Sequence, residues 1–526
     1  MPVTFTPVTF APVTFTPVTF THWQAFWAFI LLGLALLVGK LLKSRFSLLE
    51  SLFLPSSIIA GFVVLALGPQ GAGLLVQRFW DANHLLAGGC FPESIVQVWK
   101  GLPGLLINVV FAALFLGKSI PGVREMWFRA GAHVAYGQTL AWGQYVVGIS
   151  LCMVLLTPVF GISPLAGALI EISFEGGHGT AAGMAGTFRD LGFEEGADLA
   201  LGLATVGLIS GIVLGTILIN WAARRRYIGQ AIADGRDAGE GISRAVEEDA
   251  YSQELVATFS PIRISSLPAA SGADGDTLEE LKELEWEKEQ EVRPTDPLSV
   301  HLGVVALAIT LGWLIKEGLL TLEWHTWGGE GGFKLIPYVP LFPLAMLGGV
   351  MIQIFADKTG LNQHINRRLM NRISGAALDL TIISALGTLS LTAIGANWVP
   401  FLLLATAGLL WNLFCVIFLA PRMIPTAWFE RGICSFGQST GVTVTGLLLL
   451  RMADPQNKSG ALESFGYKQL LFEPIVGGGL FTAASLPLIA QFGPGFVLAL
   501  TAGILAFWLL FGLIVFGRHC RRHARG

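Results

Sequence analysis

Two glutamates in the run LAGALIEISFEGGHG have the residue type and spacing for ion or substrate chemistry. Glu171 and Glu175 are four positions apart, so on a helix they lie on one face, one turn from each other. The run around them is apolar, and a carboxylate inside a membrane is costly enough to indicate a function. We predict an ion-coupling or substrate-orienting role for Glu175, and either that role or exposure to a water-filled cavity for Glu171.

A glycine-rich segment, GGHGTAAG, begins directly after Glu175. Its glycines allow the backbone to approach a ligand closely, and a broken helix offers N–H groups to an anion and carbonyl groups to a cation. A single histidine is a poor metal site, so His178 either makes a structural hydrogen bond or contacts the substrate or ion. We predict that this break binds substrate through Gly177, His178, Gly179 and Thr180.

A second segment broken by small and polar residues lies in the other half of the chain. An offset of 260 residues aligns Gly177 with Gly437. Hydroxyl and carbonyl oxygens are hard ligands of the kind that Na⁺ accepts. We predict that this break completes the site, with substrate contacts from Gly437, Gln438, Ser439 and Thr440 and an ion contact from Thr443, and that Na⁺ is held by backbone carbonyls and the hydroxyls of Thr180, Ser439 and Thr440.

A weaker match relates the runs LLINVVFAAL and ALDLTIISAL. Each run places one polar residue, Asn108 or Asp379, in an otherwise apolar segment. Such a residue either couples an ion or cross-links helices by hydrogen bonds. We therefore predict both residues as candidates for ion coupling.

The residue patterns of an enzyme are missing. The sequence has no GxxxxGK[ST] phosphate loop, no HExxH and no paired nucleophile and base. The five cysteines form no CxxC pair and are expected to be small buried residues. We predict no enzymatic activity and no cofactor, with Na⁺ as the coupling ion.

The composition indicates a protein embedded in a lipid membrane. Hydrophobic residues make up 53% of the 526 and charged residues only 13%, whereas soluble domains carry about 25% charged residues. Moreover, the stretch 224–296 alone holds 9 basic and 17 acidic residues, so the rest is poorer still in charge. Nothing in the composition indicates nucleic-acid binding.

Apolar runs long enough to cross a bilayer as helices predict eleven spans. They lie at about 23–39, 54–68, 102–117, 133–157, 199–221, 298–319, 337–356, 374–395, 398–420, 470–490 and 495–517. With the N-terminus outside, the short loops and tail place 19 Lys and Arg inside and 5 outside. This asymmetry predicts an outside N-terminus and a cytoplasmic C-terminus.

The order of spans and breaks predicts an all-α fold of two inverted-topology repeats. Five spans precede a polar stretch and five follow it, and each half has its broken segment between its fourth and fifth spans. The predicted parts are a disordered Pro-repeat tail (1–22), a first repeat (23–221) with a re-entrant segment (164–187), a cytoplasmic linker (222–297), a second repeat (298–490) with a re-entrant segment (431–450), and an eleventh helix with a basic tail (491–526).

The motif Gly176-Gly177-His178-Gly179-Thr180 resembles the GGHGT motif of the bacterial sodium/glutamate symporter family. The second segment, from Cys434 to Gly441, resembles that family's second glycine-rich motif more loosely, and the Leu-Pro pattern from Leu54 to Gly61 resembles its first hairpin. The resemblance covers roughly residues 23–490.

The resemblance implies a sodium-coupled symporter of glutamate or a related carboxylate, working by alternating access. It further implies a multi-pass protein of the bacterial plasma (inner) membrane, a homodimer and a moving transport domain. Two departures, Glu175 beside the anion site and Gln438 and Ser439 in the second motif, leave open a proton-coupled carrier of another small organic anion. A channel that uses the breaks as a filter and a receptor acting through the linker are further alternatives.

Overall fold

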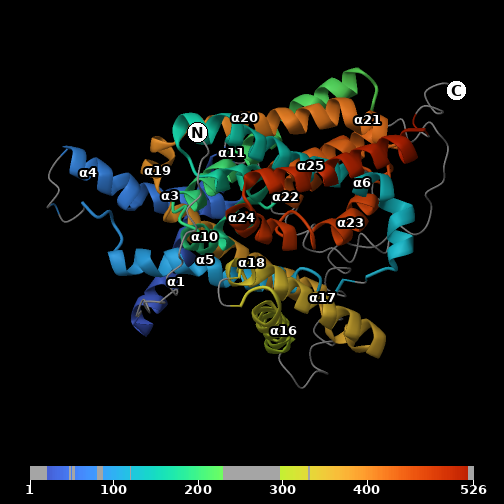
Figure 1. Ribbon diagram of the computed structural model, residues 1–526. Coiled ribbons are helices and arrows are strands. Elements are labelled where there is room, and N and C mark those ends of the chain that lie inside the picture. Colours follow the sequence, from blue (N-terminus) through green and yellow to red (C-terminus); the bar gives the residue numbers. More distant parts are fainter. Residues whose placement is uncertain are drawn as a thin grey trace, which may run out of the picture.

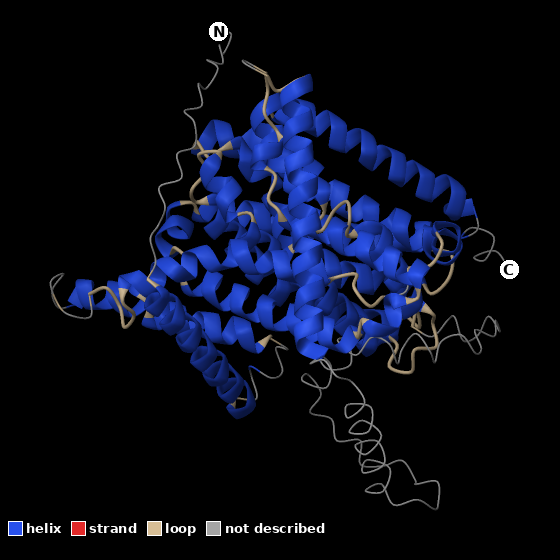
Figure 2. Ribbon diagram, turned by 90° about the horizontal axis from the view of Figure 1, so that it is seen from below, coloured by secondary structure: helices blue, strands red, loops and turns tan. Residues whose placement is uncertain are grey.

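The computed structural model describes residues 21–46, 49, 54–79, 84, 87–118, 120–228, 297–329, 332–518 and 520. These residues form helices and connecting loops and contain no strand (Figure 2). Residues 1–20 of the predicted tail, most of the linker 222–297 and the end of the basic C-terminal tail lie outside the described residues, and the last residue of the predicted tail, His22, begins α1.

The first half of the chain contains both long helices and a run of short ones. The long helices are α1 (His22–Arg45), α5 (Glu93–Ala113), α6 (Val123–Leu151) and α11 (Gly196–Arg224). The shorter ones are α3 (Ser56–Leu67), α4 (Leu74–Phe79), α7 (Thr157–Phe160), α8 (Leu169–Phe174), α9 (Gly177–Gly183) and α10 (Ala185–Asp190). Thus the first predicted re-entrant segment coincides with the series of short helices between α7 and α11.

The second half follows a similar order. Its helices are α16 (Pro297–Thr326), α17 (Phe342–Thr359), α18 (Arg367–Gly387), α19 (Leu391–Ala396), α20 (Trp398–Phe414), α21 (Ala420–Met423), α22 (Trp428–Ala453), α23 (Ala461–Phe472), α24 (Leu480–Phe492) and α25 (Pro494–Phe511). Proline and glycine stand at several helix boundaries, as at Gly493 and Pro494 between α24 and α25, because neither residue continues a helix well.

Ten helices of the described residues are long and apolar enough to cross a membrane. A helix meets the hydrogen-bonding needs of its own backbone, which lipid cannot do, so the chain is a multi-pass membrane protein. Two predicted spans differ from expectation. Residues 470–490 are split into α23 and α24 by the turn 473–479, and α17, which corresponds to the predicted span 337–356, is not among the ten.

By their packing the helices form two bundles; α16, α17 and α18 of the first lie at the bottom of Figure 1, and α20 lies at the top. In the first bundle, α1 packs on α3, α16 packs on α17, α3 packs on α18, and α5 packs on both α17 and α18. In the second bundle, α6 packs on α20, α23 and α25, and α11 packs on α8, α9 and α22. Because α9 also packs on α5 and α18, it joins the two bundles.

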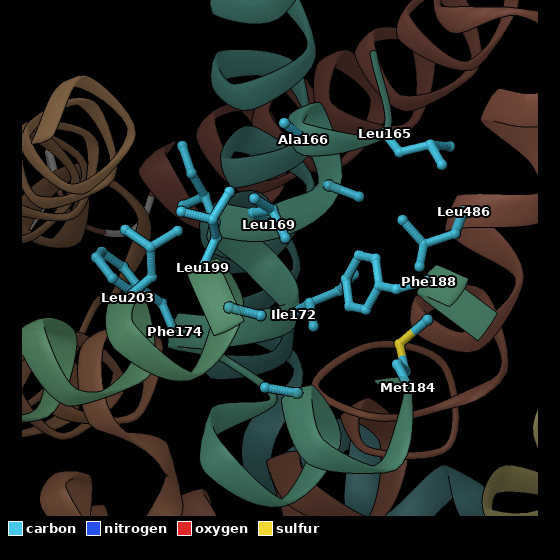
Figure 3. Close-up of a cluster of buried hydrophobic side chains, with 14 of the residues drawn as sticks. Leu165, Ala166, Leu169, Ile172, Phe174, Met184, Phe188, Leu199, Leu203 and Leu486 are labelled. Carbon is cyan, nitrogen blue, oxygen red and sulfur yellow. The ribbon is translucent and has the colours of Figure 1, made fainter. Parts of the chain in front are cut away.

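The largest apolar core surrounds the short helices of the first half (Figure 3). In Figure 3 the Phe188 ring of α10 points toward Ile172 of α8, with Leu486 of α24 beside it. All three residues are buried. Since α8 and α10 lie on opposite sides of the break at 175–177 and share this core, the chain turns back on itself there.

Candidate functional site

The first hairpin is the segment 164–190, and its tip is Gly177. Gly177 has a φ of 67°, in the left-handed region that favours glycine because a side chain there meets the backbone. The helix α8 ends at Phe174, and α9 starts at the tip. The N-terminus of a new half-helix is therefore placed in the interior of the second bundle.

The second hairpin is α22, which is not one straight span. Gly441 and Val442 have non-helical backbone angles, and a Cβ built on Gly437 would lie 2.8 Å from Cα of Gly446. In a continuous helix, residues nine positions apart are separated by roughly 13 Å. The two halves of α22 therefore fold back on each other, with the tip at Gly441 and Val442.

The two tips touch. A Cβ on Gly177 would collide with Cγ1 of Val442, and Val442 itself has a φ of 62°. This conformation is unusual for a β-branched residue and costs on the order of 1–3 kcal/mol. The two tips, Gly177 and Val442, each have a positive φ and are 265 positions apart, whereas the sequence alignment of the two segments uses an offset of 260.

Ser439 connects the hairpins to each other and to the surrounding helices. Its hydroxyl donates a hydrogen bond to Oε1 of Glu175. Its carbonyl accepts hydrogen bonds from Nε2 of Gln144 at 2.7 Å and from Nδ2 of Asn412 at 2.5 Å. Asn412 thus links α20 to the second hairpin, and Ser439 brings one oxygen of Glu175 into a buried polar network.

The other oxygen of Glu175, Oε2, is buried without a hydrogen-bond partner, and so are Oε1 of Gln144 and the hydroxyl of Thr180. All three residues are at most 3% exposed. Buried polar atoms are normally paired, so these oxygens are available to a ligand. Carboxylate, amide and hydroxyl oxygens are the kinds of ligand atom that bind a sodium ion.

Glu171 has different surroundings from Glu175. Its Oε1 accepts hydrogen bonds from the backbone N–H of Gly477 at 2.7 Å and from the Thr482 hydroxyl at 2.8 Å. Its Oε2 accepts one from the Tyr145 hydroxyl at 2.5 Å. Glu171 is fully buried, so it does not face a water-filled cavity, and it holds the turn 473–479 between α23 and α24.

Lys468 is a site residue that sequence analysis missed. Lys468 is one of the 19 basic residues that the charge asymmetry assigns to the inside loops and tail, and this assignment is wrong because Lys468 lies in α23 and is fully buried. Its ammonium donates to Oε1 of Gln438 and lies 4.3 Å from the centre of the Phe472 ring. Gly137 of α6 provides the space, since a Cβ there would lie 3.0 Å from Nζ of Lys468.

A third acid, Glu473, was also missed because it lies in a predicted continuous span. Its Oε1 accepts hydrogen bonds from Nε2 of Gln469 at 2.6 Å and from the Thr443 hydroxyl at 3.3 Å. Thr443 follows the second tip directly, so Glu473 lies at the start of a half-helix. Lys468 interacts electrostatically with both Glu175 and Glu473.

Of the remaining predicted substrate contacts, two have partners within the protein. Nε2 of His178 lies 3.0 Å from the Thr205 hydroxyl of α11. The Thr440 hydroxyl donates to the carbonyl of Phe436 at 2.8 Å, within its own half-helix. A Cβ on Gly179 would lie 3.1 Å from Ile107 and 3.2 Å from Leu378, so this glycine faces the first bundle.

Asn108 and Asp379 lie on α5 and α18, away from the network around Ser439. Nδ2 of Asn108 donates to the carbonyl of Gly104 in its own helix at 2.8 Å. Asp379 is partly exposed and interacts electrostatically with Lys40. Each of the two residues follows a residue, Ile107 or Leu378, that faces Gly179 of the first hairpin.

The charged cluster after the first hairpin is mostly exposed, as Arg189 and Glu194 are. Asp198 differs, because its carboxylate accepts a hydrogen bond from the backbone N–H of Ser390 at 2.9 Å. It therefore fixes the connection between α18 and α19. No group of three or more His, Cys, Asp or Glu that could hold a metal ion occurs among the residues that the structure describes.

Comparison with known proteins finds similarity to one family. Residues 105–269 match the family model described as sodium/glutamate symporter. The sodium/glutamate symporter of Haemophilus influenzae is 27% identical over 229 residues, which are 43% of this chain and 51% of the relative. That of Escherichia coli K12 is 21% identical over 455 residues, 84% of this chain and 91% of the relative. No solved structure matches.

These matches confirm the family resemblance predicted from the GGHGT motif. The chain spans about half the length of the first relative and nine-tenths of the second. The matched family consists of symporters, which are transporters rather than enzymes, in agreement with the missing catalytic patterns.

Proposed function

Because the chain is related to the sodium/glutamate symporters, we propose that it is a secondary-active symporter of glutamate or a closely related acidic amino acid, driven by Na⁺. The observation that carries the proposal is the contact of two broken-helix tips, Gly177 against Val442, beside buried oxygens without partners. Such tips bring half-helix N-termini toward an anion and free oxygens toward a cation.

We propose that the two halves are inverted repeats and that the hairpins enter the membrane from opposite sides. Packing in the first bundle supports this. In the proposed repeat, α1 corresponds to α16, α3 to α17 and α5 to α18. The contact of α1 with α3 then has its equivalent in that of α16 with α17. Likewise the contact of α3 with α18 has its equivalent in that of α17 with α5. An outside N-terminus, a cytoplasmic C-terminus, the bacterial plasma membrane and a homodimer belong to the same proposal.

In this proposal the hairpin tips form the site. Substrate contacts come from the backbone around Gly177 and Gly437 and from Ser439. The unpaired Thr180 hydroxyl and the oxygens of Glu175 and Gln144 serve the ion or the substrate. Alternating access then consists of movement of the second bundle, which contains both hairpins, against the first.

The test is uptake of labelled glutamate into proteoliposomes that contain the purified protein. We expect uptake to rise above equilibrium only when Na⁺ is higher outside than inside. Uptake that ignores Na⁺ and follows an imposed proton gradient would instead identify the proton-coupled carrier. Unitary conductance in planar bilayers, far above the turnover of a carrier, would identify a channel.

A further inference from the structure

Lys468 lacks a direct partner of opposite charge. Among the described residues, no carboxylate oxygen forms an ion pair within 4.0 Å of its ammonium, although the side chain is fully buried. The contacts of the ammonium are the Gln438 amide oxygen and the faces of Phe465 and Phe472. A lysine is almost never fully buried unless it is paired, and this ammonium, with three donors, has hydrogen atoms left to give.

Glu175 has the opposite need, because it has an acceptor oxygen that lacks a donor. Glu175 is 3% exposed. One of its carboxylate oxygens accepts a hydrogen bond from Ser439, and the other has no partner. Leaving a buried charge uncompensated is strongly destabilising. Glu175 thus offers an acceptor where Lys468 offers donors.

The two groups are near each other without touching. They interact electrostatically, but they do not form an ion pair. Their side-chain partners are also neighbours in the second hairpin, because Gln438, which binds Lys468, is adjacent in sequence to Ser439, which binds Glu175. A ligand that satisfies both must present a cation to Glu175 and an anion to Lys468.

We propose that Glu175 and Lys468 form a clamp for an amino-acid zwitterion, with the α-ammonium on Oε2 of Glu175 and the α-carboxylate on Nζ of Lys468. The clamp rests on the proposed function and adds a rule for choosing substrates. It explains why an acid stands beside a site for an anionic substrate, since the acid binds the ammonium group. Dicarboxylates without an amino group are then poor substrates.

The test is binding to the purified full-length protein in detergent with Na⁺, measured by calorimetry. Glutarate has both carboxylates of glutamate but no amino group, and 4-aminobutanoate lacks the α-carboxylate. We expect the wild type to bind glutarate at least about 30-fold more weakly than glutamate, because glutarate has no cation to pair with the buried Glu175. Glu175→Gln should reduce this ratio below about 3.

Lys468→Met should reduce the discrimination against 4-aminobutanoate in the same way. Glu194→Gln and Lys458→Met, at exposed positions, are the matched controls and should keep the wild-type ratios. Glu175→Asp, which retains the charge, should keep discrimination against glutarate and so shows that a change in Glu175→Gln is not misfolding.

An unchanged glutarate ratio in Glu175→Gln overturns the clamp, and so does a wild type that binds no amino acid. Loss of Na⁺ dependence in that variant with an unchanged ratio would assign Glu175 to the ion instead and likewise overturns the clamp. Wild-type protein that shows the predicted ratios but accumulates glutamate without regard to Na⁺ supports the clamp and refutes only the proposed coupling.

Discussion

Glu171 and Glu175 lie one turn apart, yet their oxygens have different partners. Three hydrogen bonds occupy Glu171, whereas Glu175 has one bonded and one free oxygen. The same residue type on one helical face therefore supports two roles. Glu171 stabilises a turn, and Glu175 remains open to a ligand.

Replacing Glu171 should reduce stability. Glu171→Ala removes the acceptor for Gly477, Thr482 and Tyr145, and hydrogen bonds to charged groups contribute about 1.5–3 kcal/mol each. We expect the free energy of unfolding to fall by about 2–4 kcal/mol, measured as a lower midpoint of thermal unfolding in detergent. Glu194→Ala, at an exposed position, is the control, and equal midpoints for both variants would refute the structural role of Glu171.

The contact of Gly177 with Val442 should be sensitive to a single methyl group. Gly177→Ala places a Cβ against Cγ1 of Val442, and overpacking of this kind costs about 1–3 kcal/mol. We expect at least about tenfold slower glutamate uptake with normal membrane insertion. Adding Val442→Gly removes the collision and should restore part of the uptake, measured in proteoliposomes. If the double variant is as slow as Gly177→Ala, the contact is not the cause.

Part of this site could be predicted from sequence. Carboxylates and glycines stand out in apolar runs, so Glu175 and the GGHGT segment were found. Lys468 was not, because a lysine in a less apolar stretch is indistinguishable from a loop charge until its helix is packed. Its burial depends on Gly137, 331 positions away, and no local pattern shows such a pairing.

Helices were easier to predict than the breaks between them. Apolar length identified most of the long helices, but residues 470–490 were interpreted as one span because EPIVGGG has the composition of an apolar run with few charges. The break there depends on Gly477 and Gly478, which have φ values of 73° and 103°. It also depends on Glu171, whose carboxylate accepts the Gly477 N–H.

The packing of α6 on α23 should control the position of Lys468. Gly137→Val fills the space beside its ammonium and should displace the side chain from Gln438. We expect glutamate affinity to fall at least about tenfold, since overpacking costs about 1–3 kcal/mol, as measured by calorimetry. Gly101→Val in α5, where a Cβ meets nothing within 4 Å, is the control. Unchanged glutamate affinity in Gly137→Val would show that the position of Lys468 does not contribute to substrate binding.

At the scale of the whole molecule, the two bundles meet where α9 packs on α5 and α18. Small residues line this interface. A Cβ on Gly183 would lie 3.0 Å and 3.1 Å from the two γ carbons of Ile107. Contacts through small residues leave few interdigitating side chains, so the sliding of the second bundle against the first that we propose costs less here than across a deeply interlocked interface.

Covalently joining the bundles should therefore stop transport. Cysteines at Ile107 and Gly183, in a chain without its five native cysteines, have Cβ atoms within reach of a disulfide, about 3.5–4.5 Å. We expect oxidation to abolish Na⁺-driven glutamate uptake and a reductant to restore it. Cysteines at Val64 and Gly387, which face each other within the first bundle, should cross-link without this loss. Full uptake by the oxidised 107–183 pair would mean that the bundles do not move against each other at α9 during transport.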